Sequence, residues 1–373
     1  MTGGAKWDIP SGATAKVSII DSTARMSGLP AATFFKTPFE GFDHLDTAPT
    51  WCLLVENEKS GRKVVFDLGV PKDLSTFAPV YVKMIDESGM REGFKAEKDV
   101  AQILQDNGVA PSEVSSIIWS HQHPDHIGDP NTFPKTTEIV VGQGFTKAYC
   151  PGYPANPESP VCEAYFADRT LREINYESDL KIGGLRAFDF FGDGSFYLLD
   201  TPGHTSGHLS ALARTTHGSG DGEDDTFILM GGDVCHHGGE LRPSPHRPLP
   251  PNVDEGPLYP VPASLRGFCP GSLLFGALQK SHGRHPTEQP FSDPGDLEED
   301  HAASMATIRE VQIPDAMDNV FFVFAHDATL MDVVEVFPAP ANDWKAKGWA
   351  EKSHWTFLKN FAQAAAKFAD AKN

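Results

Sequence analysis

Short apolar runs bounded by polar or glycine-rich residues recur along most of the chain. Polar and apolar residues alternate from Lys16 to Asp21, which is typical of a strand with one buried face. The apolar runs at 51–55 and 63–67 flank a polar segment that contains Gly61, a pattern that predicts a hairpin. Further runs have the length of buried strands and lie at 115–121, 137–142, 196–200, 209–213, 227–230 and 319–324. The pattern therefore predicts a core built on β-strands.

Helical spacing of apolar residues is confined to fewer segments. It is found within 98–107, and two more helices are expected near 263–280 and 294–312. Residues 22–48 are expected to form a loop because they are rich in Gly, Pro and Thr. Residues 70–96 have no clear period, and we expect them to line the mouth of a site. Strands alternating with helices imply helices packed on a sheet, in layers.

The C-terminal region, residues 349–369, has apolar side chains on roughly one helical face. These side chains are Trp355, Leu358, Phe361, Ala365 and Phe368. We expect an amphipathic helix that packs back on the sheet. A dimer contact is the alternative use of such a stripe, so the chain is expected to be a monomer or a homodimer.

Charge and composition narrow the possible partners. The 373 residues include 51 acidic and 31 basic side chains, a net charge of −20, which disfavours binding to nucleic acid or to an anionic membrane surface. We find no apolar run long enough to span a bilayer and no secretory signal pattern at the N-terminus. Five cysteines are too few for a disulfide framework, and a Cys150–Cys162 bridge is not expected. A cytoplasmic enzyme is therefore the expectation.

The strongest chemical signal is the stretch from Ser120 to Asp129, which follows an apolar strand. His121 and His123 are two residues apart, so both project to the same side of an extended segment. Asp125 and His126 follow in a tighter turn and can point at a second position beside the first. Imidazole nitrogen and carboxylate oxygen are ligands that suit zinc and similar divalent ions. The stretch therefore predicts a metal site at a strand end.

Three more ligand-type residues stand at or just past the ends of apolar strands. His204 follows a Thr-Pro-Gly turn, Asp233 follows two glycines, and His326 follows the run at 319–324. The two glycines allow the backbone to approach its neighbours closely, and one carboxylate can supply an oxygen to each of two metal ions. A nearby histidine, His208, is expected to support the turn by hydrogen bonding.

The motif His-x-His-x-Asp-His, with Thr-Pro-Gly-His and Gly-Gly-Asp in this order, resembles the signature of the metallo-β-lactamase superfamily. The resemblance covers roughly residues 16–336 and implies an α/β fold, a four-layer αβ/βα sandwich. It implies two Zn²⁺ ions per chain, with Fe, Mn or Co as alternatives. The implied ligands are His121, His123 and His204 for the first ion, Asp125, His126 and His326 for the second, and Asp233 as the bridge. It also implies that Asp67 steers a metal-binding histidine.

The resemblance implies a hydrolase in which a hydroxide held by two metal ions opens a small cyclic ester or amide. The ligand pattern is similar to that of N-acyl-homoserine lactonases and of fungal lactamases that open benzoxazolinone-type rings. The lactonases carry a Tyr three residues after the bridging Asp, where this chain has His236. Asp125 and His236 are therefore the candidate catalytic residues. A glyoxalase II-like thioester hydrolase is the alternative, and a catalytically silent scaffold is disfavoured because every ligand position is filled.

We interpret residues 1–373 as one domain with a long inserted region at about 236–316. The insertion carries several histidines, of which most are expected to lie at the surface: His236, His237, His246, His282 and His285. A segment of this length beside the metals is the expected selector of a small cyclic substrate.

Overall fold

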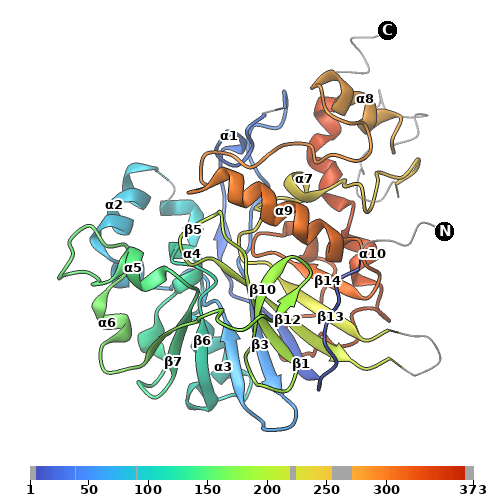
Figure 1. Cartoon of the computed structure of the whole chain (residues 1–373). Coiled ribbons are helices and arrows are strands. Elements are labelled where there is room, and N and C mark those ends of the chain that lie inside the picture. The colour runs from blue at the N-terminus through green and yellow to red at the C-terminus, as the bar shows by residue number, and fades with distance from the viewer. Residues whose placement is uncertain (1–5, 38, 90, 219–223, 254–270, 366–373) are drawn as a thin grey trace.

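Two six-stranded sheets face each other at the centre of the molecule (Figure 1). The computed structural model describes residues 6–37, 39–89, 91–218, 224–253 and 271–365. The order of the first sheet is β1 (Ala15–Asp21), β3 (Trp51–Asn57), β4 (Lys63–Phe66), β6 (Val114–Ile118), β7 (Glu138–Val141) and β8 (Leu171–Glu173). The order of the second is β14 (Val320–Val323), β13 (Thr226–Met230), β12 (Leu209–Thr216), β11 (Phe196–Asp200), β10 (Leu185–Asp189) and β9 (Lys181–Ile182).

The apolar runs in the sequence are continuous because both faces of these strands are covered. In β13, Ile228 and Met230 point into the core between the sheets, whereas Phe227 and Leu229 point outward to a helical layer. Alternate side chains of a strand project to opposite faces, so every residue of this run is buried. The same division holds in β3, where Leu53 lies between the sheets and Leu54 lies in the outer core.

Helices form the two outer layers, which completes the four-layer sandwich implied by the motifs. The helices of the N-terminal half are α1 (Ala31–Phe34), α2 (Pro79–Glu87), α3 (Val100–Asp106), α4 (Pro124–Ile127), α5 (Phe145–Tyr149) and α6 (Glu163–Phe166). Those of the C-terminal half are α7 (Gly238–Leu241), α8 (Leu274–Ser281), α9 (His301–Asp315) and α10 (Trp349–Ser353). The helices α3 to α6 share a core with the first sheet, and α7 and α9 share one with the second.

Two segments that the sequence left as irregular contain regular structure. Residues 22–48 include β2 (Arg25–Met26) and α1, and residues 70–96 include α2 and β5 (Phe94–Lys95). The strands β2 and β5 pair with each other. The elements β2, β5 and α1 have two to four residues, too few for a periodic pattern, and the pairing of β2 with β5 joins residues far apart in the chain.

The C-terminal helix expected at 349–369 is interrupted. The helix α10 ends at Ser353, and the 3₁₀ helix η8 (Thr356–Phe361) follows. The guanidinium of Arg242 donates a hydrogen bond of 3.1 Å to the backbone oxygen of His354. In a continuous helix this oxygen would accept a hydrogen bond from the backbone amide of Leu358. Phe361 is fully buried and stacks on Phe291 of the insertion, so this residue of the apolar stripe packs on the inserted region. The expected contribution of Phe368 lies outside the described residues.

The inserted region connects β13 to β14, two neighbouring strands of the second sheet, and contains α7, α8 and α9. The helix expected at 263–280 is described from Leu274, and its first expected residues lie outside the described part of the chain. As predicted, His246, His282 and His285 lie at the surface, whereas His236 is buried. Cys150 and Cys162 are free thiols, as expected. Among the helices of the described ranges, none has the length and apolarity required to cross a bilayer.

Candidate metal centre

The ligand-type residues converge at one edge of the sandwich because the strands that carry them end there. The strand β14 runs parallel to β13, so the segments after both strands, with His326 and Asp233, leave the second sheet at the same edge. In the first sheet β4 and β6 are parallel, which brings Asp67 and His121 together in the same way. Backbone hydrogen bonds join the two sheets here, from Leu209 N to Ser120 O at 2.9 Å and from Trp51 N to Ala325 O at 2.9 Å.

A close backbone approach sets the position of Asp233. The preceding Gly232 has a φ of +55°, and a Cβ at this position would lie 2.8 Å from the Cβ of Ser120. Only glycine combines this conformation with this spacing. The Asp233 amide donates a hydrogen bond of 3.1 Å to Nε2 of His208, whose Nδ1 is 2.8 Å from Thr201 O. As the sequence predicted, His208 supports the turn.

The first group of potential ligands contains His121, His123, His204 and Asp233, with one donor atom of each within 4.8 Å of the others. The Nε2 atom of His204 lies 3.0 Å from Nδ1 of His123. The Oδ2 atom of Asp233 lies 3.7 Å from His121 Nε2 and 3.6 Å from His204 Nε2.

The second group contains Asp125, His126 and His326. The Nε2 atom of His326 is 3.3 Å from Asp125 Oδ2. The Oδ1 atom of Asp233 is 3.2 Å from Nε2 of both His126 and His326. The Oδ2 atom of Asp233 also lies 3.2 Å from His326 Nε2. The Asp233 carboxylate therefore lies between the two groups, and all seven residues named from the sequence come together.

The donor atoms of this centre fit divalent cations. In the described structure, Nε2 of His121, Nε2 of His126 and Oδ1 of Asp233 are buried without a hydrogen-bond partner. Unpaired buried polar atoms cost free energy, and a cation held between them would satisfy them. Three histidines with a carboxylate, and two histidines with two carboxylates, are donor sets that suit zinc and related metals.

Burial favours the neutral, metal-binding form of the first group. Desolvation, with the neighbouring histidines, lowers the pKa of His121 well below its usual value and the pKa of His123 to about 3. Burial opposes ionisation of Asp233, but His126 and His326 hold its pKa well below the usual range. The Asp233 carboxylate is therefore ionised at neutral pH.

The ring nitrogens that face away from the centre have fixed partners. The Nδ1 atom of His126 lies 2.8 Å from Asp67 Oδ2, as the resemblance implied for Asp67, and Nδ1 of His326 lies 2.9 Å from Pro49 O. The Nδ1 atom of His204 lies 3.2 Å from Oε1 of Glu298. Sequence reasoning missed Glu298. Acidic residues are common near the start of a helix, and no sequence motif marks this one as a partner of His204.

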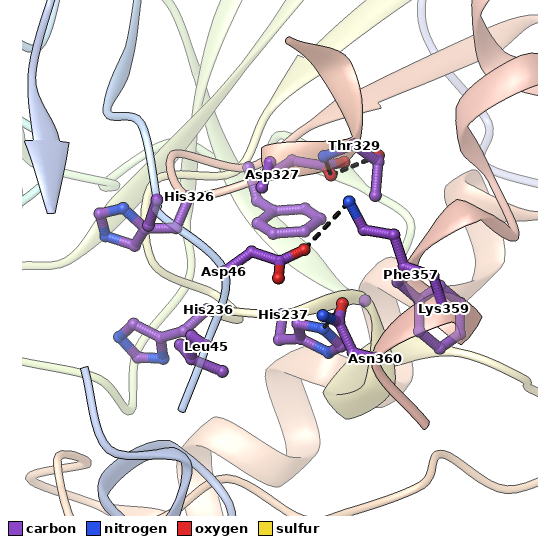
Figure 2. Close-up of a pocket in the computed structure, with 14 residues that line it drawn as sticks. Leu45, Asp46, His236, His237, His326, Asp327, Thr329, Phe357, Lys359 and Asn360 are labelled. Atoms are coloured by element: carbon purple, nitrogen blue, oxygen red, sulfur yellow. Dashed lines mark hydrogen bonds and ion pairs between the residues drawn. The ribbon is translucent and has the colours of Figure 1, made fainter. Parts of the chain in front are cut away.

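His236 lies at the edge of the centre. Its Nε2 is 3.4 Å from Asp233 Oδ2, and its Nδ1 is 3.7 Å from the buried carboxylate of Glu240. Burial lowers the pKa of His236, but these two carboxylates outweigh that effect and raise it well above its usual value. Figure 2 shows the rings of His236 and His326 side by side; they stack at 5.8 Å. Beyond them lies a water-sized cavity of about 20 Å³, whose lining includes the Asp46–Lys359 ion pair of 3.0 Å.

A cavity of about 460 Å³ opens onto the centre. Its inner end is lined by ligand-type residues: His123, Asp125, Asp233, His236 and His326. Its walls are mainly apolar and come from β2, α1, α2, β5 and the insertion, with Leu29, Phe34, Val80, Phe94 and Leu297 among them. The expectation that residues 70–96 line the mouth is confirmed, and residues 22–48 contribute as well.

Comparison with known proteins gives the family. Residues 45–213 match the family model of the Metallo-beta-lactamase superfamily. The gamma-lactamase FDB1 of Fusarium pseudograminearum is 41% identical over 357 residues, which cover 93% of this chain and 83% of that protein. The chain belongs to the metallo-beta-lactamase superfamily. It is a hydrolase of this superfamily, and the metallo-hydrolase mfmC of Annulohypoxylon moriforme is 38% identical over 94% of the chain and 88% of that protein.

Solved structures agree on the fold of this superfamily member. A structure of an N-acyl homoserine lactone hydrolase, with the product N-hexanoyl-L-homoserine at its catalytic metal centre, has a TM-score of 0.52. It is 18% identical and covers 88% of this chain and 99% of that one. At this identity the likeness shows the shared sandwich and says nothing of the substrate.

Proposed function

We propose that the protein is a dinuclear metal-dependent hydrolase that opens a small cyclic ester or amide, a lactone or lactam of the benzoxazolinone kind. The observation that carries the proposal is the placement of Asp233. Its carboxylate oxygens lie 3.2 to 3.7 Å from histidine nitrogens of both ligand groups, and the cavity reaches the same carboxylate. The relatives named gamma-lactamase and metallo-hydrolase support the same class of reaction.

Two divalent ions, when bound, would polarise the substrate carbonyl and provide a nucleophile at neutral pH. His121, His123 and His204 would hold one, and Asp125, His126 and His326 the other, with Asp233 between them. The protein contributes rigid strand ends and partnered outer nitrogens, which keep the ligands in place without rearrangement during the reaction.

His236 and Asp125 are the residues that would touch the substrate. The Nε2 atom of His236 lies at the inner end of the cavity, where a protonated ring nitrogen donates to the oxygen on which negative charge develops. The Asp125 carboxylate lines the same cavity and is partly exposed in it, so it can carry a proton to the leaving oxygen or nitrogen.

The cavity favours a neutral, largely apolar substrate. None of its described lining residues is Lys or Arg, while Asp125, Glu158 and Asp233 are acidic. A glutathione thioester carries carboxylates for which the described lining offers no Lys or Arg partner, which argues against the glyoxalase II-like alternative. The mainly apolar walls leave room for apolar substituents on the ring.

The test is proton release from a panel of substrates, read with a pH indicator and zinc-loaded protein. The panel contains a γ-lactone, an acyl-homoserine lactone, benzoxazolinone, a β-lactam and a glutathione thioester. We expect release from the lactones or from benzoxazolinone, abolished by a chelator and restored by zinc. Release from the thioester alone would contradict the proposal, as would ring opening that persists in metal-free protein.

A further inference from the structure

The inserted region grips the loop that carries His204. The backbone amide of Glu299 donates to His204 O at 3.0 Å, and that of Asp300 donates to Gly203 O at 2.9 Å. Gly203 has a φ of +133°, and a Cβ there would lie 2.2 Å from the backbone nitrogen of Ser304 in α9. The start of α9 therefore lies directly against this loop and holds it by backbone contacts.

Glu298, also in the inserted region, contacts the imidazole ring of His204. Its Oε1 lies 3.2 Å from Nδ1 of His204, and both side chains are 2% exposed. A carboxylate accepts hydrogen bonds only, so His204 must carry its proton on Nδ1. The lone pair of Nε2 then faces His123 and Asp233, on the side where the ligand-type atoms gather.

The second oxygen of Glu298 gives an independent reason to expect a cation nearby. Oε2 is buried and has no hydrogen-bond partner among the described residues. Glu298, His204 and His236 present donor atoms within 4.8 Å of one another. A buried carboxylate with so few partners is costly, and a cation on the far nitrogen of His204 would offset part of that cost through the imidazole.

The next residue in the chain offers a contrast. Glu299 accepts hydrogen bonds from Ser206 N at 2.7 Å and Ser206 Oγ at 2.8 Å, and from the Tyr149 hydroxyl at 3.0 Å. It therefore holds the same loop with more hydrogen bonds than Glu298 makes. Its side chain contacts none of the seven ligand-type residues in the described structure.

We propose that Glu298 is a positioning residue for the metal centre, through which the insertion fixes the tautomer and orientation of His204. This inference rests on the proposed function, in which His204 is a metal ligand. It gives the insertion a second role besides lining the cavity with Leu297. The centre is then completed by a carboxylate that lies 94 residues after the histidine it orients.

The experiment compares Glu298→Gln with Glu299→Gln, a matched change one residue away. Zinc affinity is measured on metal-free proteins by competition with a chromophoric chelator, and Co²⁺ binding by its visible absorption. We expect Glu298→Gln to weaken zinc binding at one site by about 10- to 100-fold and to alter the Co²⁺ spectrum. Glu299→Gln removes the same charge at a side chain that forms its hydrogen bonds with Ser206 and Tyr149, so it should keep the wild-type affinity and spectrum.

Glu298→Asp is the second variant and keeps the charge with a shorter reach. It should recover part of the lost affinity, and it replaces Glu298→Gln in the comparison if the latter does not fold, since its longer His204 contact should still weaken binding. Wild-type affinity and an unchanged spectrum in a folded Glu298 variant would overturn the inference while leaving the proposed function standing. Equal losses in Glu299→Gln would also overturn it, because the effect would then come from the loop as a whole. A wild-type protein that binds no zinc would overturn the proposed function as well, and the first titration would reveal it.

Discussion

The carboxylate of Asp67 is held against the ring of His126, with Oδ2 2.8 Å from Nδ1. The same carboxylate accepts hydrogen bonds of 2.7 Å from the backbone amide and the hydroxyl of Ser120. Asp67 itself has a φ of 59°, a left-handed conformation that Asp and Asn tolerate better than most residues. Asp67, the residue directly after β4, thus sets the direction of a histidine in α4, the short helix that follows β6.

Asp67→Asn should test this relationship with little disturbance of the backbone. Asn adopts the same conformation but presents a neutral amide to His126, so the ring loses its anionic partner. We expect about 10- to 100-fold weaker metal binding at the site that contains His126, with a similar loss of kcat/KM. Isothermal titration with zinc measures the first effect. Unchanged affinity would show that Asp67 only completes the turn.

Asp233→Asn should remove the link between the two ligand groups. The side chain keeps its shape and the backbone amide keeps its bond to His208, but one charged oxygen is lost. We expect the purified variant to retain at most one of two zinc ions, with kcat/KM lower by roughly a hundredfold or more. Elemental analysis after gel filtration gives the metal content. Full activity with two ions bound would contradict the bridging role.

His236 should matter for the reaction more than for metal binding. His236→Phe keeps a flat ring beside Phe34 and His326 but removes the donor. We expect kcat to fall by about 10²- to 10³-fold, the usual effect of losing one donor to a developing oxyanion, with both metal ions retained. His236→Tyr restores a hydroxyl donor and should recover part of the loss. If Phe and Tyr behave alike, His236 has only a packing role.

Acid should destabilise the metal-free protein partly through His237, which is away from the seven ligand-type residues. Burial lowers its pKa to about 4; Nδ1 accepts a bond of 2.9 Å from Gly239 N, and Nε2 lies 3.1 Å from Asn360 Oδ1. In the unfolded chain His237 binds a proton near its ordinary pKa of 6.5, whereas in the native chain it binds one only near pH 4. Stability from this group is therefore present above pH 6.5 and is lost as pH falls toward 4.

Between pH 6.5 and about pH 5 the loss from His237 amounts to about 2 kcal/mol. The measurement is urea unfolding of the metal-free protein at several pH values. His237→Asn keeps an acceptor at the start of α7 and does not titrate, so its unfolding free energy should fall less steeply with acid than that of the wild type. Parallel slopes would assign the acid sensitivity to other buried histidines.

The apolar rim of the cavity should favour substrates that carry apolar substituents. Met84 of α2 lines the cavity and is 42% exposed, so its replacement is tolerated by the fold. Met84→Asp adds a carboxylate to an apolar rim and should lower kcat/KM for lactones with long alkyl substituents, mostly through KM. The unsubstituted γ-lactone serves as the control and should be affected least. An equal loss of kcat/KM for the alkyl-substituted and the unsubstituted lactones would show that the alkyl group does not bind beside Met84.

Most strands of the two sheets and the seven ligand-type residues could be predicted because their signals are local. Burial on both faces makes the apolar run of a strand such as β13 continuous, and all the ligand-type residues except His326 stand next to or near Pro, Gly or a second histidine. Glu298 could not be found in this way, because its role depends on a contact across 94 residues. The interruption after α10 was missed for the same reason, since it follows from Arg242 reaching a distant carbonyl.

The walls of the 460 Å³ cavity and the ligand-bearing strand ends come from different stretches of sequence. Most wall residues belong to short elements outside the two large sheets, such as α1 and α2, whereas Asp233 and His326 are fixed by paired strands. Substitutions in the walls can therefore reshape the chamber while the hydrolytic apparatus stays intact. Substrate selectivity can therefore change among variants of this protein while the catalytic residues stay the same. A mutant library confined to the wall residues should yield new substrate ranges without loss of hydrolysis.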